Sequence, residues 1–284
     1  MSWLTEPFTM GFMQRALVAS IIVGVVCAII GCYIVLRSMA FLGDALAHAI
    51  LPGVAVAYLA GANLLAGALI AGVIVAVGIS YVSRAGTIKE DTAIGIFFAA
   101  ALALGVVLIS TMDTYAVDLT HVLFGNVLGV STVDLWITAG LAVAVLVAIA
   151  LLYKRLLVVS FDPILGQTLG LRTNLLRTGL FLMLAATIVV SLRTVGVALV
   201  AAMLVTPPAA AYLLTRRLPA MMAVSALIGI VSAIGGLYVS YYLNVASGGA
   251  MVLVATGIFL VAFLFAPARG VLWRLRRPRR AKAS

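Results

Sequence analysis

Apolar runs long enough to cross a bilayer constrain this chain more than any other feature. A helix needs about 20 residues to cross a hydrocarbon core about 30 Å thick, and short loops divide this sequence into runs of that length. They occupy nearly the whole chain, so the sequence predicts an all-α polytopic membrane protein with eight or nine transmembrane helices. The candidate spans cover residues 14–36, 39–59, 62–83, 92–111, 132–152, 175–193, 196–215, 221–243 and 249–267.

The composition agrees with this assignment. Hydrophobic residues make up 65% of the chain and charged residues only 9%, whereas soluble domains are about 45–50% apolar and about 25% charged. The net charge of +10 could indicate nucleic acid, but the basic residues cluster in short loops and in the tail, which is a topology signal. We therefore expect one transmembrane domain over residues 1–272, and a basic cytoplasmic tail over residues 273–284 that lies against anionic lipid headgroups.

The distribution of lysine and arginine also predicts the orientation. If the tail is cytoplasmic and nine spans alternate, all basic residues except Arg15 and Arg193 lie inside, as the positive-inside rule requires. The N-terminus then lies outside, and with eight spans it would change sides. No basic segment precedes the first apolar run, so we expect no cleaved signal peptide. Cys27 and Cys32, both in the first span, are interpreted as small core residues.

An aspartate and a histidine stand one helical turn apart in the second span. Asp44 and His48 share one face of a helix, and they lie roughly 10 Å and 16 Å beyond Arg37, near the bilayer midplane. Ionisable groups at that depth usually mark an ion path, and these two suit a divalent first-row metal. A helix cap at Asp44 and a satisfied core histidine are the alternatives. Gly43, Pro52 and Gly53 should interrupt this span, and Pro207-Pro208 the seventh.

Further acidic residues and one histidine fall on the outer side in this topology. Asp113, Asp118 and His121 lie there, together with Glu6 and Asp134. Such a mouth would concentrate cations, although ordinary loop polarity would place the same residues there.

The longest inner loop, residues 154–174, has the pattern of a short helix. Asp162 suits the N-cap, Pro163 the first helical position and Gly170 the residue after the helix end. The helix, residues 163–169, carries Ile164, Leu165 and Leu169 with nothing of its own to bury them against. Such a helix lies in the membrane interface or docks into a partner, and we favour docking.

Motifs for other chemistry are missing from the sequence. It contains no Gly-x-x-x-x-Gly-Lys-Ser/Thr for ATP and no His-Glu-x-x-His for a metalloprotease. A serine hydrolase motif with a usable histidine is also lacking. Two histidines and one buried carboxylate are too few for a proton relay, so we predict a transport subunit and no enzyme.

Four ordered stretches resemble the permease subunits of ABC importers for manganese, zinc or iron(II), the ABC-3 metal permeases. They cover most of the chain, and the first is long and specific. The stretches are residues 35–55 (VLRSMAFLGDALAHAILPGVA), 118–131 (DLTHVLFGNVLGVS), 161–171 (FDPILGQTLGL) and 195–211 (VGVALVAAMLVTPPAAA).

The resemblance implies a fold related to type II importers in a bacterial cytoplasmic (inner) membrane, with a second permease chain, identical or a sister subunit. It also implies an ABC ATPase dimer below, which holds ATP, and an extracytoplasmic metal-binding protein above. Asp44 and His48 match the family's membrane metal residues. This chain has Ile164-Leu165-Gly166 where the family often has a carboxylate. The ATPase-engaging loop corresponds to Asp162, Pro163, Leu165, Gly166, Leu169 and Gly170.

These expectations define the functional hypothesis. A binding protein delivers a divalent ion, ATP acts on the partner, and no cofactor is permanently bound. The version of the motif at residues 120–125 resembles the manganese or iron branch of the family. We expect Mn²⁺ as the favoured ion, with Zn²⁺ or Fe²⁺ as the alternatives. The alternative is a secondary transporter or channel that works without an ATPase.

Overall fold

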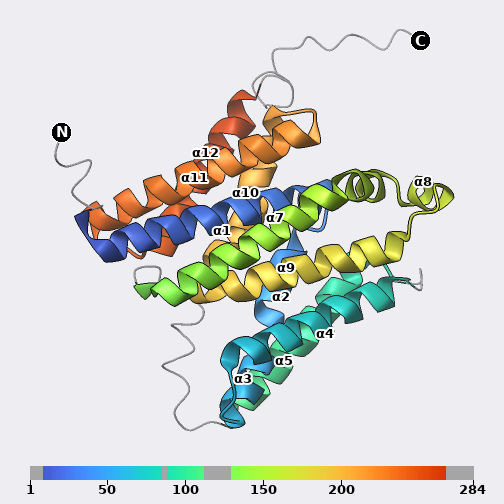
Figure 1. The fold of residues 1–284 in the computed structure, drawn as a ribbon, viewed down its shortest axis with the longest axis horizontal. Helices are drawn as coiled ribbons and strands as arrows, with labels where there is room; N and C mark the ends of the chain where they lie inside the picture. Colours follow the sequence, from blue (N-terminus) through green and yellow to red (C-terminus); the bar gives the residue numbers. More distant parts are fainter. Residues whose placement is uncertain (1–8, 85–87, 112–128, 267–284) are drawn as a thin grey trace.

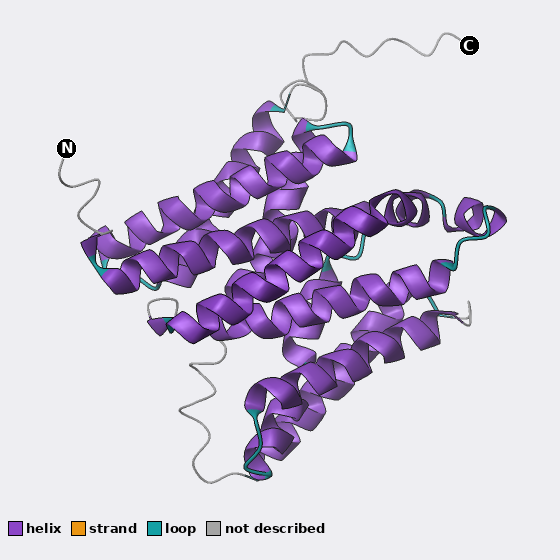
Figure 2. Cartoon of the chain, in the orientation of Figure 1, coloured by secondary structure: helices purple, strands orange, loops and turns teal. Residues whose placement is uncertain are grey.

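Helices account for every regular element in the described part of the chain (Figure 2). The computed structural model describes residues 9–84, 88–111 and 129–266, so the prediction of an all-α protein is confirmed. In chain order the helices are α1 (Gly11–Leu36), α2 (Phe41–Ala49), α3 (Leu51–Leu59), α4 (Leu64–Arg84), α5 (Glu90–Ser110), α7 (Thr132–Phe161), α8 (Pro163–Thr168), α9 (Thr173–Val195), α10 (Val197–Leu214), α11 (Leu218–Leu243) and α12 (Ser247–Phe265).

Eight helical segments among the described residues are long and apolar enough to cross a membrane, with α2 and α3 together forming one of them. The segment Leu199–Leu214 within α10 is apolar but shorter, which accounts for the predicted eight or nine spans. The helix that contains the predicted fifth span, residues 132–152, is longer than that span, because α7 continues to Phe161. At about 1.5 Å per residue, a helix of 30 residues is longer than the hydrocarbon core is thick, so its end can hold α8 beyond the membrane.

Three layers of helices place α2 in the interior. Helices α3, α4 and α5 lie together on one side in Figure 1, α11 and α12 lie on the other, and α1, α7 and α9 run between them. The helix α1 contacts α7, α9, α10 and α11, while α2 contacts α4, α5, α9 and α10. Both cysteines of α1, Cys27 and Cys32, are fully buried free thiols, as predicted for core residues. The short helix α8 projects at one end of the bundle (Figure 1).

The second span is interrupted as the sequence predicted. Helix α2 ends at Ala49, α3 begins at Leu51, and Pro52 lies in the first turn of α3, where its missing N–H removes no helical hydrogen bond. Gly53 lies directly against α4, because a Cβ there would approach the carbonyl oxygen of Gly67 to 2.2 Å. The two glycines therefore let the backbones of α3 and α4 pack in contact.

The predicted break at Pro207-Pro208 was wrong. Both prolines lie inside α10, which continues to Leu214. Pro208 has no N–H to offer the carbonyl of Leu204, four residues earlier, and α1 approaches that carbonyl at Gly31, where a Cβ would come within 2.1 Å of the Leu204 oxygen. The helix α10 continues because packing against α1 holds it on both sides of the missing hydrogen bond, an effect of tertiary structure that local propensity does not contain.

Candidate metal centre

One face of α2 is partly open although most of the helix is buried. From Leu42 to Ile50, every residue is buried except Asp44 and His48, whose side chains are 45% and 26% exposed. Gly43, in contrast, packs against Leu204 of α10. The predicted pair therefore shares one helical face, and the described part of this chain covers that face only in part.

The two side chains are within reach of each other. Nδ1 of His48 lies 3.0 Å from the backbone oxygen of Asp44 and 3.5 Å from its carboxylate oxygen Oδ1. In the tautomer where Nδ1–H donates to that backbone oxygen, Nε2 keeps its lone pair for a cation. The ring of Phe98 from α5 meets the His48 ring edge-on, with centroids 5.7 Å apart. Thus α5 limits the orientations available to the imidazole.

A single chain supplies only part of a metal site here. Among the described residues, no group of three or more histidine, cysteine, aspartate or glutamate side chains could hold a metal ion. A divalent transition metal is usually held by four or more ligands. The Asp44–His48 pair can therefore contribute one carboxylate and one imidazole, and a complete shell requires ligands from elsewhere.

The residues predicted for an outer mouth have different outcomes. Asp113, Asp118 and His121, like Glu6, lie outside the described residues. Asp134 is described, and it closes the start of α7: its N–H donates to Ser131 Oγ at 3.1 Å, while the Ser131 hydroxyl donates to Asp134 Oδ2 at 2.6 Å. That reciprocal contact is a helix cap, so local structure explains Asp134.

The predicted loop helix forms between α7 and α9. The backbone N–H groups of Ile164 and Leu165 donate to Asp162 Oδ1 at 3.0 and 2.9 Å, so Asp162 is the N-cap. Gly170 has φ of 73°, a conformation that favours glycine. The helix ends at Thr168, one residue earlier than predicted.

The apolar side chains of α8 point away from the bundle while its glycine faces inward. Ile164 and Leu165 of α8, and Leu169 directly after the helix, are exposed. Gly166 is buried, and a Cβ there would lie 2.9 Å from Cγ2 of Thr173 at the start of α9. Helix α8 is consequently attached closely to α9 and keeps an apolar surface free.

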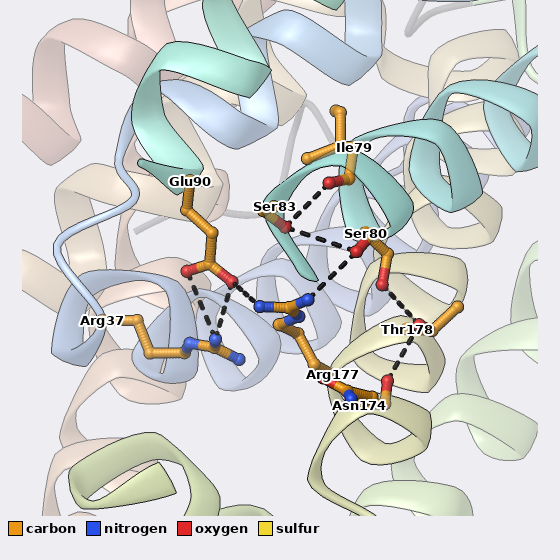
Figure 3. A network of polar contacts seen from close by, with 8 residues as sticks. All are labelled: Arg37, Ile79, Ser80, Ser83, Glu90, Asn174, Arg177 and Thr178. Atoms are coloured by element: carbon orange, nitrogen blue, oxygen red, sulfur yellow. Dashed lines mark hydrogen bonds and ion pairs between the residues drawn. The ribbon is translucent and has the colours of Figure 1, made fainter. Parts of the chain in front are cut away.

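A partly buried ionic cluster that joins α1, α5 and α9 was not predicted from the sequence (Figure 3). Glu90 at the start of α5 accepts from Arg37 Nη2 at 3.0 Å and 3.3 Å, and from Arg177 Nη1 at 3.0 Å. Burial lowers the pKa of the Arg37 guanidinium, and the Glu90 carboxylate counters that shift. The signal available in the sequence was that all three charges occupy predicted inner ends of spans, but no spacing rule joins them.

The apolar bundle, with its interrupted interior helix and an ionisable pair on one open face, has the architecture of a multi-pass membrane permease. Residues 9–266 match the ABC 3 transport family, and the chain therefore belongs to that family.

Known proteins support the same classification along nearly the full chain. The manganese transport system membrane protein MntC of Halalkalibacterium halodurans is 52% identical, covering 95% of this chain and 93% of the relative. The chelated iron transport system membrane protein YfeD of Yersinia pestis is 40% identical, covering 93% and 89%. A solved structure of PsaBC from Streptococcus pneumoniae in complex with Fab superposes with a TM-score of 0.84 at 38% identity, covering 97% of this chain and 99% of that chain.

Proposed function

We propose that this chain is the permease subunit of an ATP-driven importer of divalent transition metals, with Mn²⁺ as the favoured ion. The observation that carries the proposal is the open face of α2, where only Asp44 and His48 escape burial between Leu42 and Ile50. A pair of cation-binding side chains left partly exposed on a mostly buried interior helix is expected where an ion passes between subunits.

A second permease chain would complete the metal site. Two copies, or this chain and a sister subunit, that meet at the α2 face would offer two carboxylates and two imidazoles. That mixed oxygen and nitrogen set suits Mn²⁺, Fe²⁺ and Zn²⁺. Since such donors bind Zn²⁺ more tightly than Mn²⁺, selectivity for Mn²⁺ would come from site geometry or from the extracytoplasmic binding protein that delivers the ion.

The names of the relatives support manganese first and iron second. The H. halodurans protein is named for manganese transport and the Y. pestis protein for chelated iron. The ion itself is cargo, so the permease needs no resident cofactor. An acidic outer mouth with Asp113, Asp118 and His121, and a tail on anionic lipid, remain predictions from the sequence.

ATP hydrolysis would take place on a separate ATPase dimer that docks on α8. The sequence has no Walker-type phosphate loop of its own. Helix α8 and the residue after it present three exposed apolar side chains outside the bundle. An exposed apolar helix of this kind suits a groove on a partner. Because α8 contacts both α7 and α9, a motor that moves α8 would move two of the spanning helices.

Uptake measurements test the whole proposal in a bacterial host without its own importers. Cells would express the permease with and without its ATPase and binding protein, and uptake of Mn²⁺, Zn²⁺ and Fe²⁺ would be compared. We expect uptake only with all three components, and its loss in Asp44→Asn. Uptake by the permease alone would overturn the proposal in favour of a secondary transporter or channel.

A further inference from the structure

Glu90 connects three segments that are far apart in the sequence. It pairs with Arg37 at the C-terminal end of α1 and with Arg177 in α9, and it is itself the first residue of α5 (Figure 3). The side chains of Arg37, Glu90 and Arg177 are 9%, 23% and 14% exposed. The cluster is therefore largely shielded from water, where charge pairing is stronger than on a surface.

Two of the three segments lead directly to the candidate metal centre. The chain turns after Arg37 through Ser38, whose φ of 58° is uncommon for a residue other than glycine, and then enters α2 at Phe41. On the other side, α5 starts at Glu90 and carries Phe98 to the His48 ring. Glu90 therefore binds the segment that leads into α2, the helix of Asp44 and His48. It also begins α5, the helix whose Phe98 packs against His48.

The third segment leads to the loop helix. Arg177 lies near the start of α9, the helix against which Gly166 of α8 is packed. Its Nη2 also donates to the backbone oxygen of Ser80 in α4 at 3.0 Å, and the Ser80 and Thr178 hydroxyls are hydrogen-bonded to each other. One guanidinium therefore ties α9 to α4 and, through Glu90, to α5.

The charges make Glu90 the member on which the cluster depends. Two guanidiniums share one carboxylate, which leaves a net charge of +1 in a largely buried place. Without the carboxylate, the guanidiniums would repel each other where water cannot solvate them well. While Glu90 pairs with both arginines, the end of α1, the start of α5 and the start of α9 are held together and should move as one unit.

We propose that Glu90 is a positioning residue that transmits displacement of α8 and α9 to the Asp44–His48 pair. This inference rests on the proposed function, since it concerns the step between the ATPase and the metal site. Glu90 would touch neither the ion nor ATP. It would make uptake depend on ATP hydrolysis by keeping α9, α5 and the entry to α2 in one mechanical unit.

The test uses a charge-balanced double variant in the complete complex of permease, ATPase and binding protein in lipid vesicles. Glu90→Gln with Arg177→Met breaks the link between α5 and α9 but keeps the net charge of the cluster at +1. Asp91→Asn is the matched control, because it neutralises the adjacent, exposed carboxylate of the same helix. Assembly, ATP hydrolysis, Mn²⁺ binding and Mn²⁺ uptake are measured for each.

We expect the double variant to assemble, bind Mn²⁺ and hydrolyse ATP within about twofold of the wild type, with uptake per ATP lower by roughly tenfold. Asp91→Asn should match the wild type in all four. Wild-type uptake per ATP in the double variant would overturn the inference, as would a loss of uptake that merely parallels lost assembly or lost Mn²⁺ binding. If the wild-type complex itself imports no Mn²⁺, the proposed function fails first, so the two failures are distinguishable.

Discussion

The open face of α2 and the Glu90 cluster use charged side chains in opposite ways. Asp44 and His48 touch each other but leave donor atoms free and remain partly exposed. Arg37, Glu90 and Arg177 are more buried and direct their charges at one another. The two regions are connected through α2 and α5, yet one is incomplete within this chain and the other is complete.

This difference follows from what each region can do. A side chain that binds and releases an ion needs a donor atom whose lone pair is free. Such a side chain contributes little to the stability of the fold, because solvent or a partner supplies its hydrogen bonds. In a largely buried ionic cluster, each charge must be paired within the cluster, because removing one partner leaves an unpaired charge away from water. Substitutions in the two regions should therefore separate loss of function from loss of stability.

Asp44→Asn should have the largest effect on uptake and almost none on stability. Neutralising a 45% exposed carboxylate removes a hard metal ligand, while surface substitutions usually change the free energy of unfolding by no more than about 0.5 kcal/mol. Uptake of Mn²⁺ should fall to the level of cells without the permease, with an unchanged melting temperature. A clear drop in melting temperature would mean that Asp44 is a structural residue.

Leu165→Asp with Leu169→Asp should abolish uptake in a different way. Both side chains are exposed, Leu165 on α8 and Leu169 directly after it. Charges there should leave the permease folded and prevent this apolar surface from docking. Co-purification of the ATPase measures this directly. Gln167→Asp, on the same short helix, is the control for added charge, and retention of the ATPase by the double variant would exclude α8 as the docking surface.

Glu90→Gln should lower the stability of the fold, whereas Asp44→Asn should leave it almost unchanged. Loss of the carboxylate leaves Arg37 and Arg177 unpaired and should lower the free energy of unfolding by about 3 kcal/mol. Thermal unfolding of the purified permease measures the change. The charge-balanced double variant, which removes Arg177 as well, should recover most of the lost free energy of unfolding. An unaltered melting temperature in Glu90→Gln would show that the cluster does not hold the helices together.

Gly31→Ala should have a smaller effect, confined to packing. A Cβ at Gly31 would lie 2.1 Å from the Leu204 oxygen, whereas a Cβ at Gly95 of α5 meets nothing within 4 Å. Overpacking costs about 1–3 kcal/mol, so Gly31→Ala should lower the melting temperature. Gly95→Ala should leave it unchanged or raise it slightly, and equal behaviour of the two variants would contradict the close approach of α1 and α10.

Several features were predictable because they depend on neighbours in the sequence. The length of apolar runs predicted the spans, and Asp162-Pro163 with Gly170 predicted α8 to within one residue. The spacing of Asp44 and His48 predicted their shared face. The end of α7 and the continuity of α10 were not predicted, because each depends on what the helix packs against.

The sequence by itself determined that the chain is a helical membrane protein, where its spans lie and which pair of residues suits a metal. Helical periodicity and hydrophobic length are local properties, and the neighbouring residues suffice to read them. Only the tertiary structure decided that Asp44 and His48 face outward from a buried helix, and that Glu90 meets Arg37 and Arg177. The hydrogen-bonded partners of Glu90 stand 53 and 87 positions away in the chain, and only helix packing brings charges so distant in sequence together.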